Sequence, residues 1–215
     1  RRRHTRYISV TGVQTCALPI YVSGLEVRKS RAELVEELSP LLVNSKGALN
    51  PNMEARSIIN AFKDREMFRV DMRHIIGHCP EFNDFSSELS DVAETVVAAM
   101  FEHCFAQLSA KHGVPLVDGD ADSRPVRVTV LALGKAGGRE LGFASDIELM
   151  FVYEQAGRTS GPDVIGAAEF FVRLVEDFAN SIEARRQGIF QIDLRLRPYG
   201  NAGSLAVSQI GRAHV

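Results

Sequence analysis

Residues 133–153 read LGKAGGRELGFASDIELMFVY and join a glycine-rich turn to a strand that begins with two acids. Asp146 and Glu148 are two positions apart, so on a strand their side chains point to the same face. The apolar residues that alternate with them point to the opposite face, where we expect the core; they are Ile147, Leu149 and Phe151. Two carboxylates fixed on one face can hold a hard divalent cation, Mg²⁺ in particular.

A third acid comes from a strand that we expect over residues 190–197, which contains the stretch QIDLRLR. Alternation separates its apolar residues from its charged ones: Ile192, Leu194 and Leu196 on one face, Asp193, Arg195 and Arg197 on the other. If the two strands are neighbours, Asp193 lies beside the first two acids. The sequence therefore predicts a three-carboxylate site in which Asp146, Glu148 and Asp193 are the metal ligands and the catalytic residues.

The same two stretches also contain candidates for binding phosphate groups. Gly137 and Gly138 have no Cβ, so their backbone N–H groups can approach phosphate oxygens closely. Ser145 adds a hydroxyl at the edge of the site. Arg195 and Arg197 are expected to bind phosphate oxygens or to hold the carboxylates in place. A Walker-type phosphate loop is absent from the sequence.

Each of these features is weak when taken alone. An Asp-x-Glu on a strand is most often solvated or paired with a cation, and two adjacent glycines usually form a simple turn. Their joint order is far more specific: Gly-Gly, then Ser-Asp-x-Glu, then Asp-x-Arg-x-Arg-Pro. This order favours nucleotidyl transfer, in which metal ions bridge a triphosphate, activate an attacking hydroxyl and neutralise the leaving pyrophosphate.

Upstream of this region the periodicity is helical. Apolar residues in i, i+3, i+4 steps predict a helix over residues 88–112, capped by Ser86 or Ser87 and ended by Gly113. Two further helices are expected over residues 31–43 and 54–76.

The spacing of apolar residues changes after Gly113. Residues 115–125 are interpreted as a linker, and residues 126–133 as a strand with apolar residues on both faces, which is typical of a buried strand. Residues 157–161 are expected to form a loop and residues 164–185 a helix. The coarse architecture is a set of helices followed by a mixed α/β sheet.

Both ends of the chain resemble translated sequencing adapter. Residues 10–20 and 1–6 back-translate to a common short-read adapter, residues 7–9 fit its variable barcode, and residues 210–215 fit its reverse complement. The alternative is a genuine basic arm or signal segment at the N-terminus. We therefore interpret residues 1–20 and 210–215 as artefacts, and the remainder as an internal fragment of a longer protein.

The composition of the 215 residues is that of an ordinary globular protein, with 45% hydrophobic and 24% charged residues and a formal net charge of −2. Without the five arginines of the two ends, 20 basic residues face 27 acidic ones, a net charge of −7. Such acidity disfavours a sequence-independent nucleic-acid binder. No apolar run is long enough to span a membrane, and the remaining two cysteines indicate a cytoplasmic setting.

Three stretches of the sequence together resemble a known family. GKAGGRELGFASDIELMFVY and QIDLRLRPYGNAGSLAVS, with KDREMFRVDMRHIIG upstream, are similar to the glutamine synthetase adenylyltransferase/deadenylylase family, a branch of the polymerase-β-like nucleotidyltransferases. The resemblance covers about residues 60–208. It implies an α+β fold, in which a helical segment (21–114) precedes a nucleotidyltransferase core (115–209) with a mixed sheet and flanking helices.

The resemblance also implies an activity. It predicts Mg²⁺, with ATP or with ADP and phosphate, and the transfer of AMP to or from a tyrosine of glutamine synthetase in the regulation of nitrogen metabolism. By matching position, Asp146, Glu148 and Asp193 are the metal carboxylates, and Gly137, Gly138 and Ser145 form the phosphate turn. Glu148 stands where the family usually has Asp. PII signalling proteins are expected partners of regions outside this fragment.

Several alternatives stay open at this stage. The chain resembles both the adenylylating and the adenylyl-removing module, and the sequence does not decide between them. A different polymerase-β-like transferase with another acceptor, and an inactive regulatory or interaction module, are the competing functions.

Two other clusters receive structural interpretations. The basic residues Lys63, Arg65, Arg69 and Arg73 could face phosphates or glutamine synthetase, but a solvated helix face is preferred. His74, His78, Cys79, His103 and Cys104 lack the spacing of a zinc framework, so core cysteines and surface histidines are expected.

Overall fold

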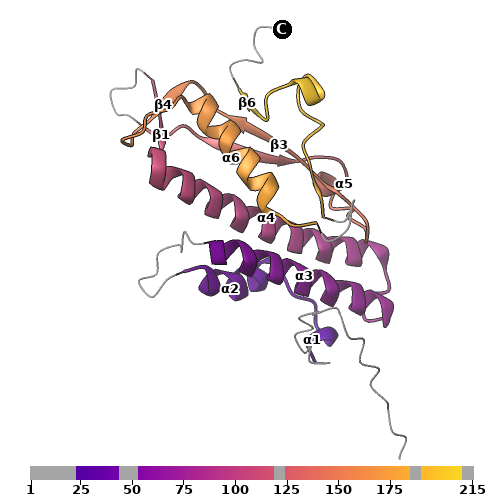
Figure 1. Cartoon of the computed structure of the whole chain (residues 1–215). Helices are drawn as coiled ribbons and strands as arrows, with labels where there is room; N and C mark the ends of the chain where they lie inside the picture. The colour runs from indigo at the N-terminus through magenta and orange to yellow at the C-terminus, as the bar shows by residue number, and fades with distance from the viewer. Residues whose placement is uncertain (1–22, 44–52, 119–123, 185–189, 210–215) are drawn as a thin grey trace, which may run out of the picture.

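The computed structural model of the chain describes residues 23–43, 53–118, 124–184 and 190–209. Its order is a helical part followed by a mixed sheet with flanking helices, so the predicted α+β class is confirmed (Figure 1). The two ends interpreted as adapter, residues 1–20 and 210–215, lie outside the described residues. Within the described part, no helix is both long and apolar enough to cross a membrane.

The helical part contains α1 (Ser23–Glu26), α2 (Arg31–Leu42), α3 (Met53–Ile75) and α4 (Phe82–His112). Ser30 begins α2 with a capping box, in which its hydroxyl accepts from the backbone N–H of Glu33 and the Glu33 carboxylate accepts from the backbone N–H of Ser30. Gly113, with a φ of 76°, ends α4 as predicted.

The predicted start of α4 is wrong. The helix begins at Phe82, with Glu81 at the N-cap and no side-chain cap, so Ser86 and Ser87 lie inside it. Phe85 explains the extra turn, because its fully buried ring packs 4.6 Å from the His74 ring of α3. Tertiary packing thus extends the helix beyond the capping signal.

The main sheet is organised around one central strand, β3 (Ile147–Tyr153). The strand β2 (Val128–Ala132) runs antiparallel to it along one edge. On the other edge, β5 (Ile192–Asp193) pairs in parallel with the start of β3 and β6 (Ala206–Ser208) with its end.

The predicted linker and loop contain two further strands, so these two predictions are wrong. β1 (Pro115–Val117) and β4 (Gly157–Thr159) pair in an antiparallel ribbon. Gly157 permits the approach, because a Cβ at this position would lie 2.1 Å from the carbonyl oxygen of Leu116. Residues 119–123 of the predicted linker lie outside the described residues.

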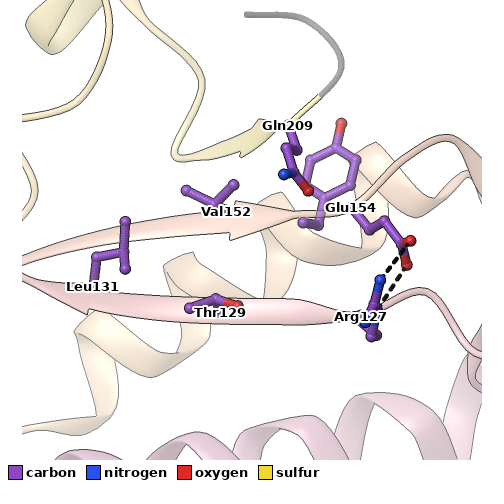
Figure 2. A pocket seen from close by; sticks show the side chains of 7 residues that line it. Arg127, Thr129, Leu131, Val152, Glu154 and Gln209 are labelled. Atoms are coloured by element: carbon purple, nitrogen blue, oxygen red, sulfur yellow. Dashed lines mark hydrogen bonds and ion pairs between the residues drawn. The ribbon is translucent and has the colours of Figure 1, made fainter.

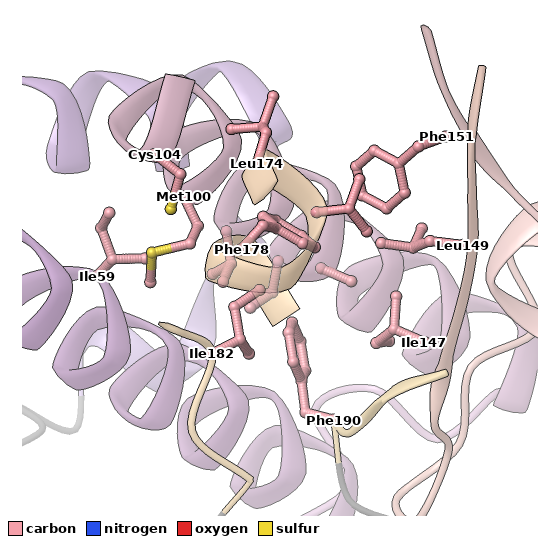
Figure 3. Close-up of a cluster of buried hydrophobic side chains, with 14 of the residues drawn as sticks. Ile59, Met100, Cys104, Ile147, Leu149, Phe151, Leu174, Phe178, Ile182 and Phe190 are labelled. Carbon is pink, nitrogen blue, oxygen red and sulfur yellow. The ribbon is translucent and has the colours of Figure 1, made fainter. Parts of the chain in front are cut away.

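Helices α4 and α6 (Ala167–Ser181) cover one face of the main sheet (Figure 1). The ring of Phe151 lies 6.1 Å from that of Phe101 on α4 and 5.4 Å from that of Phe178 on α6. Ile147 and Leu149 enter the same cluster, as predicted (Figure 3). The acids that alternate with these residues are thereby directed to the uncovered face. The predicted helix over residues 164–185 is shorter in the structure, and residue 185 lies outside the described residues.

The other face of β2 is open, contrary to the prediction of a strand buried on both faces. Thr129 is exposed and Leu131 is 38% exposed, because the helices pack against the opposite face, where Val128 and Val130 meet the core. Thr129 and Leu131 line an open pocket of about 430 Å³ with Val152, and at its end Arg127 pairs with Glu154 at 2.9 Å (Figure 2).

The basic residues of α3 do not form the predicted solvated face. Lys63, Arg69 and Arg73 are each at most 4% exposed. Arg69 Nε lies 2.7 Å from a carboxylate oxygen of Glu66, and Arg73 Nε lies 3.1 Å from one of Glu88 on α4. The prediction failed because α3 is covered by both α2 and α4, and the buried cations are compensated by buried acids.

The two cysteines Cys79 and Cys104 are buried, as predicted. His103 is also buried, so the expectation of surface histidines fails for this residue. Its Nε2 atom has no hydrogen-bond partner among the described residues, and burial lowers its pKa, since the charged imidazolium is poorly solvated there.

Candidate functional site

The three predicted acids gather where β3 begins. The parallel pairing of β3 and β5 sets Glu148 directly beside Asp193. Asp146, one residue before β3, and Asp193 both line an open pocket of about 570 Å³. Arg195 and Arg197 line the same pocket. The strand pairing that would bring the acids together is therefore present.

Arg195 is the immediate partner of Asp193. Its side chain donates to both carboxylate oxygens, with Nη2 2.6 Å from Oδ2 and Nε 3.0 Å from Oδ1, and its backbone N–H donates to Oδ1 at 2.8 Å. These hydrogen bonds lower the pKa of Asp193 and, with smaller contributions from Asp146 and Glu148, raise the pKa of Arg195. The guanidinium is thus a positive charge among the three acids.

The same contact explains why the predicted strand over residues 190–197 is wrong in length. Only Ile192 and Asp193 pair with β3. The bond from the backbone N–H of Arg195 to the Asp193 side chain turns the chain out of the ladder. Leu196, expected on the apolar face with Ile192 and Leu194, is accordingly 52% exposed.

Glu148 is accommodated by a glycine that sequence reasoning did not single out. Gly134 has a φ of +51°, and a Cβ placed there would lie 1.5 Å from Oε2 of Glu148. The carboxylate therefore rests against the bare backbone of Gly134. The signal was present in the sequence, since this glycine comes two residues after the end of β2, the strand that pairs with β3.

The glycine turn forms the short helix α5 (Gly134–Gly138). The backbone N–H of Gly137 donates to the Leu133 carbonyl at 2.9 Å, and a Cβ at Gly137 would lie 2.5 Å from the Ala132 carbonyl oxygen. In this conformation the Gly137 N–H is already satisfied, and Gly138 has no comparably close neighbour. Phosphate binding by these two residues stays a prediction.

Arg139, which the sequence analysis did not select, anchors the glycine turn to the helical part. It has a left-handed backbone with φ of 58°, and its Nη2 lies 2.7 Å from Oδ1 of Asp91 on α4. A second ion pair joins it to Glu94 of the same helix. The hydrogen bonds to these acids raise the pKa of Arg139.

Ser145 and Arg197 serve the local backbone in this structure. Ser145 is buried, and its hydroxyl accepts from the Gly142 N–H at 2.9 Å, which closes the turn before β3. Arg197 donates to the Gly203 carbonyl at 3.1 Å and to the Leu194 carbonyl, and so braces the turn that contains the 3₁₀-helix η1 (Gly200–Ala202). Their predicted contacts with nucleotide remain predictions.

The donor set fits a hard cation in chemical kind, although the side chains are not assembled around one. Carboxylate oxygens are the ligands that Mg²⁺ prefers, and Asp193, Asp146 and Glu148 all raise the pKa of Arg195. Among the described residues, no group of three or more His, Cys, Asp or Glu side chains is arranged to coordinate one metal ion. Asp193 is engaged by Arg195 instead.

Comparison with known proteins gives one consistent result. The family model described as "Glutamate-ammonia ligase adenylyltransferase" matches residues 19–212. Relatives named "Bifunctional glutamine synthetase adenylyltransferase/adenylyl-removing enzyme" include that of Shewanella loihica, 30% identical over 92% of this chain. Those of Thioalkalivibrio sulfidiphilus and Haemophilus ducreyi are 36% and 34% identical over 69% and 74% of the chain. These matches span only 15% to 21% of the length of the three relatives.

Proposed function

The chain belongs to the glutamate-ammonia ligase adenylyltransferase family, and on this premise we propose that it carries out metal-dependent nucleotidyl transfer to or from glutamine synthetase. The proposed acceptor group is a tyrosine of glutamine synthetase. Transfer to it regulates the enzyme, and the reverse process removes AMP by phosphorolysis. PII signalling proteins are proposed partners of other parts of a longer protein, and the proposed setting is the cytoplasm.

The observation that carries this proposal is the register of β3 and β5. It sets Glu148 and Asp193 side by side on the face of the sheet opposite to the helices, with Asp146 at the entrance to β3. The open pocket there admits a ligand from solvent. A carboxylate cluster beside arginines suits a substrate that combines phosphate groups with divalent cations.

Mg²⁺, when bound, would supply positive charge that stabilises the phosphate groups and the leaving group during transfer. Asp146, Glu148 and Asp193 are the residues that would hold it. The Glu148 carboxylate rests against the backbone of Gly134, which restricts its position. Asp193 becomes available once Arg195 releases it, and the freed guanidinium can then bind a phosphate oxygen. Arg195 could thus fill both roles that the sequence suggested, holding a carboxylate in place and binding a phosphate oxygen.

The first test is calorimetric titration of Mg²⁺·ATP into the chain and into Asp146→Asn. We expect the wild type to bind and the substitution to abolish binding, with both proteins showing the same circular dichroism spectrum. Unchanged binding by a folded Asp146→Asn protein would contradict the assignment of the acids.

A second variant, Gly134→Ala, probes the same site without touching an acid. The new methyl group must displace the Glu148 carboxylate, so we expect Mg²⁺·ATP affinity to fall about tenfold or more. The stability cost should be only about 1 kcal/mol, because the displaced atoms are the end of a flexible side chain and the strain is that of a left-handed alanine. Wild-type affinity in this variant would show that the position of Glu148 is unimportant.

A further inference from the structure

Two buried residues of α3 bind the backbone at the end of α6 and just beyond it. Asn60 Nδ2 donates to the Ser181 carbonyl at 2.8 Å, and Asn60 Oδ1 accepts from the Glu183 N–H at 2.9 Å. The Lys63 ammonium donates to the Glu183 carbonyl. Both side chains are nearly inaccessible to solvent. Both the N–H and the carbonyl group of Glu183, just after α6, are therefore hydrogen-bonded to side chains of α3.

The same lysine also contacts Phe190, which precedes β5. Its Nζ atom lies 5.6 Å from the centre of the Phe190 ring, a cation–π distance. Phe190 is buried, and its ring lies beside Ile147 and Ile182 in the core (Figure 3). Its φ of 53° is left-handed, a conformation that a bulky residue adopts only when its surroundings enforce it.

Phe190 and its neighbour in turn fix the two separate acid-bearing segments. The Phe190 N–H donates to the Ser145 carbonyl at 3.0 Å, and the Gln191 carbonyl accepts from the Ile147 N–H at 2.8 Å. These two bonds flank Asp146 on either side. Asp193 follows Gln191 by two residues, so one short backbone segment sets both acids.

We propose that Lys63 and Asn60 are positioning residues, which place Asp146 and Asp193 by holding the Glu183 backbone and the Phe190 ring. A buried ammonium is costly to desolvate, and here the cost is offset by the Glu183 carbonyl just beyond α6, by the Asp64 carboxylate 3.6 Å away and by the aromatic ring. The helical segment therefore forms part of the scaffold of the site. This inference rests on the proposed function for its catalytic meaning, but its geometry can be tested separately.

The decisive variant is Lys63→Met, which keeps the apolar stem and removes the ammonium. Its matched control is Arg69→Met, which removes a buried cation from the same helix where the contacts run to Glu66 and Glu88. Lys63→Arg serves as the rescue, because it restores a donor cation. Each protein is examined as the full chain, by amide hydrogen exchange and by titration with Mg²⁺·ATP below its melting temperature.

We expect Lys63→Met to accelerate exchange at the Phe190 and Ile147 amides and to weaken Mg²⁺·ATP binding about tenfold. Arg69→Met should lower the melting temperature without either change, and Lys63→Arg should recover part of the affinity. Equal exchange at these two amides in wild type and Lys63→Met would overturn the proposal, as would an equal effect of Arg69→Met. If the wild type binds no Mg²⁺·ATP, the adenylylating form of the proposed function fails while the exchange result still decides this inference.

Discussion

Acids and arginines concentrate in two regions of the molecule, the α3–α4 interface and the β3–β5 end of the sheet, and the two regions use them differently. At the interface, Glu66 and Glu88 are 1% exposed, and Arg69 and Arg73, which pair with them, are at most 4% exposed. At the end of the sheet, the side chain of Arg195 is 71% exposed beside Asp193. Buried pairs have no water to replace a lost partner, whereas an exposed arginine can exchange its acid for another ligand. The first arrangement suits stability and the second suits binding.

The largest effect on stability is expected when one buried acid is removed. Glu88→Gln removes the negative charge that pairs with the buried Arg69 and Arg73. We therefore expect the free energy of unfolding to fall by about 3–5 kcal/mol. Urea denaturation followed by circular dichroism measures this quantity. Arg195→Ala is the control and should leave the unfolding midpoint unchanged. Similar small effects of both substitutions would remove the distinction between the regions.

Asp71 on α3 tests the same idea through pH. Its Oδ1 atom is buried and receives no hydrogen bond from a described residue, and burial raises the pKa of Asp71 to about 6, slightly opposed by His74. Because the folded-state pKa exceeds the ordinary value of 3.8, ionisation destabilises the fold as the pH rises from about 4 through 6. Asp71→Asn should therefore stabilise the protein by about 1–2 kcal/mol at pH 7.5, a figure reduced for solvent screening.

The gain from Asp71→Asn should shrink as the pH falls from 6 towards 4, because Asp71 of the folded protein is then protonated and the unfolded chain begins to bind the same proton. Melting temperatures of the two proteins across this range give the measurement. A difference that does not vary with pH would show that the substitution acts through packing.

The smallest effect is expected at an ion pair on the open face of the sheet. Arg127 is 79% exposed and pairs with Glu154 (Figure 2). Arg124 pairs with the same carboxylate, and hydrogen bonds from the two arginines lower the pKa of Glu154. Arg127→Ala should leave the melting temperature unchanged, because water and Arg124 replace the lost contact. A clear destabilisation would mean that exposure alone does not separate the two kinds of pair.

The sequence was most informative where the pattern is local. Alternation in β3 correctly placed Ile147, Leu149 and Phe151 in the core, and Gly113 correctly ended α4. The fold class and the family were also predicted correctly from the two motifs. The adjacency of Glu148 and Asp193 was expected from residue types, and the parallel register provides it.

The predictions failed where distant packing decides the outcome. Nothing local in α3 reveals that it lies between two helices, so Lys63, Arg69 and Arg73 were taken for a solvated face. The β1–β4 ribbon joins segments far apart in sequence, and its strands are too short to show a period. The early end of β5 depends on a side chain bonding to its own backbone. The Glu148 carboxylate contacts the backbone of Gly134 only after β2 and β3 have paired.

The parallel pairing of β3 with β5 has a consequence for the order of folding. The α3–α4 hairpin and the β2–β3 pair connect segments that are close in sequence, so they can form early and cheaply. The β3–β5 contact must close a loop that includes all of α6. During synthesis, Asp146 and Glu148 leave the ribosome well before Asp193. The cluster of acids is therefore completed last, when most of the supporting framework already exists.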